Sequence, residues 1–83
     1  MADRAVVQVN FVAAGVQRDI DLPLDITAGE LLMGLNEAYG LGLSIEDPLR
    51  CHVKAENPTV LMHGKKTLGQ YGIRNGSVIN ITD

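Results

Sequence analysis

The sequence predicts an α+β domain of two layers, in which one main helix packs on one face of a mixed sheet of four or five strands. Three observations predict this fold class. Two segments of alternating apolar and polar residues open the chain, at 5–12 and 17–24. A leucine-rich segment with helix-capping residues follows at 27–40. Shorter alternating segments close the chain, at 49–55, 59–62 and 77–82.

The two opening segments predict a hairpin, because Gly15 between them can take the positive φ of a tight turn. The first segment separates apolar from amide side chains, with Val7, Val9 and Phe11 on one face and Gln8 and Asn10 on the other. The second places Ile20, Leu22 and Leu24 on one face and Asp19, Asp21 and Pro23 on the other. Proline cannot donate a ladder hydrogen bond, so Pro23 is expected near the strand's end or on a sheet edge.

Thr27 and Glu30 predict the start of the helix as a capping box, in which each side chain bonds the backbone N–H of the other residue. Gly40 stands where a left-handed C-terminal cap is expected. Gly34, inside the helix, is a candidate for a close approach of the sheet, at a cost of about 1 kcal/mol relative to alanine. An apolar stripe at helical spacing is predicted to face the sheet: Leu31, Leu32, Leu35, Ala38 and Tyr39.

The later segments predict the remaining strands and the connections between them. Segment 49–55 alternates strictly, with Leu49, Cys51 and Val53 expected to face the core and Arg50, His52 and Lys54 to face outward. Residues 56–58 are expected to turn the chain into the short strand 59–62, and residues 63–66 to form an exposed loop. In the last strand, Ile79 and Ile81 are predicted to face inward and Val78, Asn80 and Thr82 outward.

A length of 83 residues predicts one domain, 1–83, with an ordered core at about 5–82. No apolar run reaches the roughly 20 residues needed to span a bilayer, so direct membrane insertion is not expected. The start of the chain lacks the features of a secretory signal peptide, and the single Cys51 cannot form an internal disulfide. Both observations favour a cytoplasmic protein.

The net charge of −3 disfavours non-specific binding to nucleic acid. The charge is unevenly distributed along the chain. Residues 1–47 carry two basic and eight acidic side chains, whereas residues 48–83 carry five basic and two acidic ones. The domain is therefore expected to have an acidic side and a basic side, unless these charges simply form an ordinary solvated surface.

No residue pattern predicts a catalytic or metal site. Cys51 and His52 are adjacent, so in a strand they point to opposite faces and cannot act as a nucleophile and its base. Asp19 and Asp21 share a strand face on which no pocket is expected. His52 and His63 would meet only if their segments happened to pair, and two histidines without a third ligand are a weak zinc signal. We therefore expect no enzyme activity and no cofactor.

Residues 5–82 resemble the ubiquitin-like domains, which have the β-grasp fold. The segment TLGQYGIRNGSVINIT at 67–82 is similar to the stretch of ubiquitin that leads into its last strand, and the opening hairpin and capped helix have matching order and spacing. The similarity is closer to the YukD/EsaB-like family, which is associated with bacterial type VII secretion. It rests on VQVNF at 7–11, DLPL at 21–24, ITAGELL at 26–32, SIEDP at 44–48 and the run Tyr71-Gly72-Ile73.

The resemblance implies that the first and last strands pair in parallel, and that the protein has an accessory or regulatory role in secretion through protein–protein contact. Ubiquitin-like modifiers and sulfur carriers end in a flexible Gly-Gly tail that an activating enzyme adenylates. This sequence ends at Asp83 without Gly-Gly, so we expect neither conjugation nor sulfur carriage. Two alternatives stay open: an interaction module of another complex, and a sulfur-carrier or modifier-type protein. The oligomeric state is not predicted.

The sheet face that the helix leaves uncovered is the candidate partner-binding surface. From the alternation it carries Gln8, Asn10, Asp19, Asp21, Arg50, His52, Lys54, Asn80 and Thr82. Ubiquitin binds partners with exposed aliphatic side chains on the corresponding face, whereas polar and basic side chains are expected there in this chain. We predict a protein partner with salt-sensitive affinity, or else a plain solvated face. The candidate partner-binding residues are Arg50, His52, Lys54, Lys65, Lys66 and Arg74.

Overall fold

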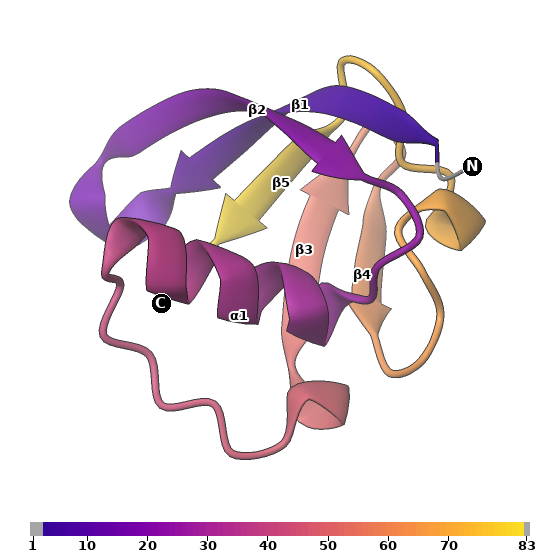
Figure 1. The fold of residues 1–83 in the computed structure, drawn as a ribbon. Helices are drawn as coiled ribbons and strands as arrows, with labels where there is room; N and C mark the ends of the chain where they lie inside the picture. Colours follow the sequence, from indigo (N-terminus) through magenta and orange to yellow (C-terminus); the bar gives the residue numbers. More distant parts are fainter. Residues whose placement is uncertain (1–2, 83) are drawn as a thin grey trace.

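A five-stranded mixed sheet with one helix on one face makes up the two layers of the structure (Figure 1). The structure is a computed structural model and describes residues 3–82, so the two ends of the predicted domain 1–83 lie outside the described residues. The sheet order is β2-β1-β5-β3-β4, and the predicted α+β fold class is confirmed. The elements are β1 (Arg4–Phe11), β2 (Val16–Pro23), α1 (Ala28–Tyr39), β3 (His52–Glu56), β4 (Val60–His63) and β5 (Val78–Ile81).

The first and last strands lie side by side, as the resemblance implied. Residues 8–11 of β1 pair in parallel with residues 78–81 of β5, and the whole of β1 pairs antiparallel with β2. A short 3₁₀ turn, η1 (Val12–Ala14), leads to Gly15 at φ 66°, which confirms the turn predicted there. Pro23 is the last residue of β2, at the edge of the sheet, also as predicted.

Capping residues hold both ends of α1, as the sequence predicts. The Thr27 hydroxyl accepts a hydrogen bond from the Glu30 N–H at 3.2 Å, and the Glu30 carboxylate accepts one from the Thr27 N–H at 3.0 Å. At the other end, Gly40 adopts φ 62° and its N–H donates to the carbonyl of Asn36. The helix buries Ala28, Gly29, Leu31, Leu32 and Leu35.

The prediction that the apolar stripe continues through the last turn of α1 was wrong. Ala38 is exposed, and Tyr39 is 46% exposed. This turn lies at the end of the sheet, beside Phe11, the last residue of β1. Only the long side chain of Tyr39 reaches back, and its ring lies 5.1 Å from the ring of Phe11.

The close approach of α1 to another segment occurs at Gly29 and not at Gly34. A Cβ added to Gly34 would have nothing within 4 Å, so the prediction for Gly34 was wrong. A Cβ added to Gly29 would instead overlap the carbonyl group of Pro48. Pro48 opens the short 3₁₀ helix η2 (Pro48–Arg50), which packs against α1. Glycine at position 29 therefore lets these two helices touch.

Strand β3 begins at His52, three residues later than predicted, because η2 precedes it. Proline opens η2, and the Asp47 carboxylate accepts a hydrogen bond from the Leu49 N–H at 3.0 Å, so turn chemistry overrides the alternating pattern. Leu49 is 47% exposed and Arg50 does not belong to the sheet, so both predicted positions were wrong. Cys51 is partly buried against the core, as expected.

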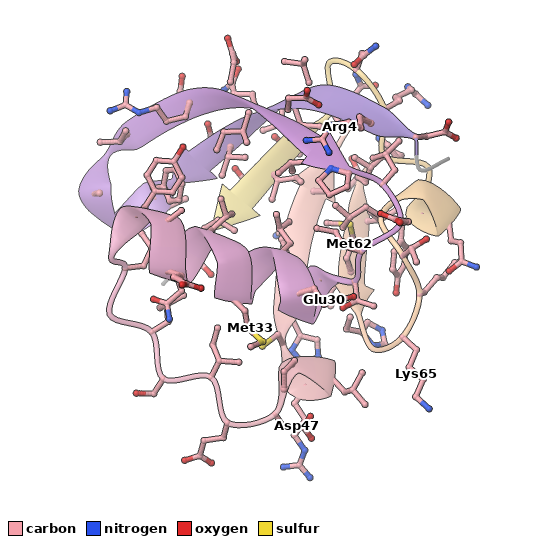
Figure 2. All side chains as sticks on the ribbon, in the orientation of Figure 1. Arg4, Glu30, Met33, Asp47, Met62 and Lys65 are labelled. Atoms are coloured by element: carbon pink, nitrogen blue, oxygen red, sulfur yellow. The ribbon has the colours of Figure 1, made fainter. Side chains whose placement is uncertain are left out.

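The core lies between α1 and the sheet, and its side chains are almost all aliphatic. The residues predicted to face inward from β1 and β5 are buried in it, as is Val53 of β3. Met62 enters the core from β4 (Figure 2), and Leu68 and Ile73 enter it from the irregular segment before β5. Its least exposed apolar members are Val7, Val9, Val53, Met62, Leu68 and Ile79.

We expect Gly29→Ala to lower the free energy of unfolding by about 1–3 kcal/mol, because the added methyl group would force α1 and η2 apart. Gly34→Ala is the matched control at an exposed helical position, and it should raise stability by about 0.5–1 kcal/mol. Urea unfolding followed by circular dichroism measures both changes. A Gly29→Ala variant as stable as the unmodified protein would contradict the packing of α1 against η2.

Candidate functional site

No part of residues 3–82 covers the sheet face opposite α1, and we call this face the open face. Its side chains alternate along each strand with the core residues, and the pairing registers align them in rows across the sheet. One row crosses all five strands with Gln17, Asn10, Asn80, Lys54 and Leu61. The next row contains Asp19, Gln8, Val78 and Glu56. Beyond these rows lie Asp21 and Val6 on one side, and His52 and His63 on the other.

Three amide side chains are hydrogen-bonded to one another at the centre of the open face. Gln8 Nε2 donates to Asn10 Oδ1 at 3.0 Å, and Asn10 Nδ2 donates to Asn80 Oδ1 at 2.9 Å. This amide ladder joins β1 to β5 and fixes the orientation of each side-chain amide. The Gln8 oxygen and the Asn80 NH₂ group end the ladder, and neither takes part in its two hydrogen bonds.

Asp19 and Asp21 give the β2 side of the open face its acidic character. Arg4 Nε lies 3.2 Å from Asp21 Oδ1, and the Arg4 guanidinium also donates to the backbone oxygen of Asp21 at 3.2 Å. Both side chains are more than half exposed, so the ion pair adds little stability. Arg4 nevertheless offsets the charge of Asp21, and Asp19 then contributes most of the negative potential on this side.

Aliphatic side chains also stand on the open face. The sequence predicted this for Val78, but it assigned neither Val6 nor Leu61 to this face. Val6 is 51% exposed and Leu61 is 54% exposed, and Val78 is partly exposed on β5. The four-residue strand β4 is too short to show by alternation which of its faces is buried. The register that pairs Leu61 with Lys54 places it on the open face.

Strand β3 brings both signs of charge to the open face. Lys54 pairs with Asn80 on one side and with Leu61 on the other. Glu56, two residues further along β3, points to the same side of the sheet. It was expected in a turn, but it is the last residue of β3, and the turn begins at Asn57 with φ 58°. A carboxylate close to Lys54 lowers the positive potential around it.

Of the three candidate residues in the strand predicted at 49–55, two lie on the open face. His52 and Lys54 point outward from β3, as predicted. Arg50 lies in η2 instead, where its side chain is 89% exposed and its Nε is 3.9 Å from an Asp47 carboxylate oxygen. Figure 2 shows Asp47 on the far side of η2, at the outer margin of the molecule. The structure therefore separates Arg50 from the other two side chains.

The remaining three candidates lie at opposite ends of β4. Lys65 and Lys66 follow its last residue, and Figure 2 shows Lys65 projecting away from the molecule. Lys66 Nζ lies 4.8 Å from the centre of the Tyr71 ring. Arg74 lies near the start of β4, where it donates to the Asn57 side chain at 3.2 Å. A four-residue strand is about 13 Å long, so Arg74 and the two lysines form separate groups.

Tyr71 binds the outward-facing backbone groups of His63, at the end of the edge strand β4. Its hydroxyl accepts a hydrogen bond from the His63 N–H at 3.3 Å and donates one to the His63 carbonyl at 3.1 Å. Tyr71 is the last residue of the 3₁₀ helix η3 (Gly69–Tyr71), and it packs against the core. Through these hydrogen bonds and its contact with Lys66, Tyr71 joins η3 to the end of β4 and to the loop that follows it.

Cys51 and His52 lie on opposite sides of the sheet, as predicted. Cys51 is partly buried, with its Sγ 3.9 Å from the Asp47 carbonyl oxygen, whereas His52 is on the open face. Within residues 3–82, no group of three His, Cys, Asp or Glu side chains could hold a metal ion. In the same part of the chain, every helix is too short or too polar to cross a membrane.

Comparison with protein families decides where the chain belongs. Residues 6–81 match the family described as WXG100 protein secretion system (Wss), protein YukD. The chain belongs to the YukD family. It is thus a ubiquitin-like protein of the WXG100 secretion system, as the resemblance implied, and the match includes nearly all of the structured domain.

Solved ubiquitin-like structures share the fold of this YukD-family chain. A ubiquitin-like domain from tubulin-binding cofactor B has a TM-score of 0.72 at 15% identity, over 96% of this chain and 89% of that one. Tubulin-binding cofactor B of Trypanosoma brucei has a TM-score of 0.72 at 17% identity, over 98% and 95%. The ubiquitin of Caldiarchaeum subterraneum has a TM-score of 0.61 at 13% identity, over 98% and 96%. These similarities confirm the ubiquitin-like β-grasp fold. No curated protein matches the chain.

We expect Tyr71→Phe to lower the free energy of unfolding by about 0.5–1.5 kcal/mol, because the His63 N–H and C=O lose their shared partner. Hydrogen exchange of the His63 amide should become faster. Tyr39→Phe removes the same atom from a ring that packs against Phe11, and it should change stability by less than about 0.5 kcal/mol. Equal effects of the two substitutions would show that the Tyr71 hydroxyl does not hold this edge.

Proposed function

We propose that this YukD-family chain is a cytoplasmic, non-catalytic accessory or regulatory protein of a bacterial type VII secretion system, and that it acts by binding another protein through its open face. The observation that carries the proposal is the open face itself, on which five strands present aligned side chains to solvent. The match to the YukD family supports the secretion context.

The open face has the composition of a protein-binding surface. Such surfaces combine apolar contact with a small number of directed hydrogen bonds. Val6 and Leu61 supply exposed apolar area, and the amide ladder supplies oriented donors and acceptors. The ladder is already formed in the free protein, so binding to it costs little additional ordering of side chains.

The charges of the open face indicate the chemistry of the partner. Lys54 favours an acidic group opposite β3, while Asp19 favours a basic group opposite β2. We infer a partner that carries both signs of charge around a mixed apolar and polar centre. Its affinity then depends on salt less strongly than for a purely basic face. The candidates Lys65, Lys66 and Arg74 would contact such a partner only beyond the two ends of β4.

Charge reversal at two matched positions tests the proposed surface. Lys54→Glu should reduce the capture of secretion-system components by the tagged chain from its native cells by about tenfold, because it places a second carboxylate beside Glu56. Arg50→Glu makes the same change of charge on η2, off the open face, and should leave capture unchanged. Quantitative mass spectrometry compares the two variants.

The outcomes separate the proposal from its alternatives. Equal losses in the two variants, or a loss only with Arg50→Glu, would move the contact away from the open face. Capture of a reproducible but unrelated complex by the unmodified chain would favour an interaction module of that complex. Circular dichroism checks that both variants fold.

A modifier or sulfur carrier is the competing class of function. The proposed role needs only surface contacts and no covalent attachment. The chain isolated from its native cells should therefore have the intact mass of the unmodified polypeptide. A thiocarboxylate at its end, or an isopeptide bond to another protein, would overturn the non-catalytic, contact-only role and favour the carrier.

A further inference from the structure

The two histidines of the chain stand directly opposite each other on neighbouring strands of the open face. His52 opens β3, and His63 ends β4 as its register partner. Both side chains are exposed, and their ring centres are 5.5 Å apart with an angle of 62° between the ring planes. The sequence places them eleven positions apart, so only the pairing of β3 with β4 brings them together.

Backbone geometry explains why the two rings come so close. The N–H and C=O of His63 both bond the Tyr71 hydroxyl, which lies on the side of β4 away from β3. His63 therefore faces His52 as a non-hydrogen-bonded pair of the antiparallel ladder. Cα atoms in such a pair are only about 4.5 Å apart, and their side chains lie closer than in the alternate pairs.

The spacing of the rings fits one metal ion bound between them. An imidazole nitrogen binds Zn²⁺ at about 2.0–2.1 Å, which puts the metal about 3.2 Å from the centre of the ring. Two such rings at a tetrahedral angle have centres about 5.2 Å apart. The observed 5.5 Å is close to this value, so the two rings stand at about the separation that a shared ion requires.

We propose that His52 and His63 form a two-histidine site for a divalent transition-metal ion of the type that imidazole prefers, such as Zn²⁺, Ni²⁺ or Cu²⁺. No third His, Cys, Asp or Glu joins them within the described residues 3–82. The other coordination positions are open to water or to a donor group of a bound protein. The site does not depend on the proposed role in secretion.

The charges around the pair make this a site of modest affinity. Lys54 lies two residues from His52 on the same face of β3, and its positive charge disfavours a cation. Lys65 and Lys66 follow His63 in the chain. The carboxylate of Glu56, at the other end of β3, partly offsets them. All of these groups are exposed, so salt screens their effect on the metal.

Titration of the tag-free protein with Zn²⁺ alone and with Ni²⁺ alone, followed by calorimetry, tests the site. We expect one saturable site per chain. His52→Gln and His63→Gln should each weaken it by about tenfold or more, because a single remaining imidazole loses the advantage of two linked ligands. Both residues are exposed, so these variants should fold normally.

Cys51→Ser is the matched control, because a thiol is the other strong ligand nearby and points to the opposite side of the sheet. It should leave binding unchanged. In nuclear magnetic resonance spectra, Ni²⁺ should broaden amide signals around His52 and His63 first. Absence of saturable binding, binding that survives both glutamine variants, or binding lost in Cys51→Ser would each overturn the proposal.

Discussion

The packing of a single helix on one face of the sheet is the constraint on which the rest of the structure depends. A helix of twelve residues is about 18 Å long, and five strands spaced about 4.8 Å apart make a sheet of similar width. α1 can therefore cover one face and no more. Gly29 extends this layer sideways, because its missing side chain lets η2 pack against α1. The opposite face has no covering layer, and its central side chains Gln8, Asn10 and Asn80 are hydrogen-bonded to one another.

The rows of the open face depend on the register of β5, which a few polar contacts fix. The Asn75 side chain accepts a hydrogen bond from the Val6 N–H at 2.8 Å and so continues the β1–β5 pairing beyond the strand. Ser77 is fully buried, and its hydroxyl donates to the Asn57 carbonyl at 2.7 Å and accepts from the Arg74 N–H at 3.0 Å. These bonds tie the start of β5 to β1 and to the β3–β4 turn. A slip of one residue would exchange the buried and exposed faces of β5, so the register must be held this firmly.

Local signals in the sequence predicted the local parts of the fold, and the failures lie where distant residues decide. The capping box at Thr27 and the turn at Gly15 depend on neighbouring residues, and both predictions were confirmed. The alternation through residues 49–51 was misleading, because the Asp47 cap and Pro48 favour a 3₁₀ turn. To predict that the close approach occurs at Gly29 and not at Gly34, one would need to know which segment packs against the helix. For the candidate site, the alternation correctly assigned most of β1, β2 and β5, whereas Leu61 and His63 could not be placed without the pairing of β3 with β4.

Features at both edges of the sheet oppose the addition of a strand from another protein, in line with the proposal that a partner binds the open face. The Leu24 N–H donates to the Asp3 carbonyl, which fixes the alternation of the β1–β2 ladder. In this alternation the backbone oxygen of Asp21 points outward from β2, and it accepts a hydrogen bond from the Arg4 guanidinium. The charged side chains of β2 and Pro23 at its end further oppose pairing with another strand. On β4 the Tyr71 hydroxyl occupies the outward N–H and C=O of His63. One residue at each edge thus has main-chain groups bonded to a side chain of the same domain, and β2 also carries charged side chains. Both features disfavour the addition of a strand and support the proposal that the exposed aliphatic and amide groups of the open face contact another protein.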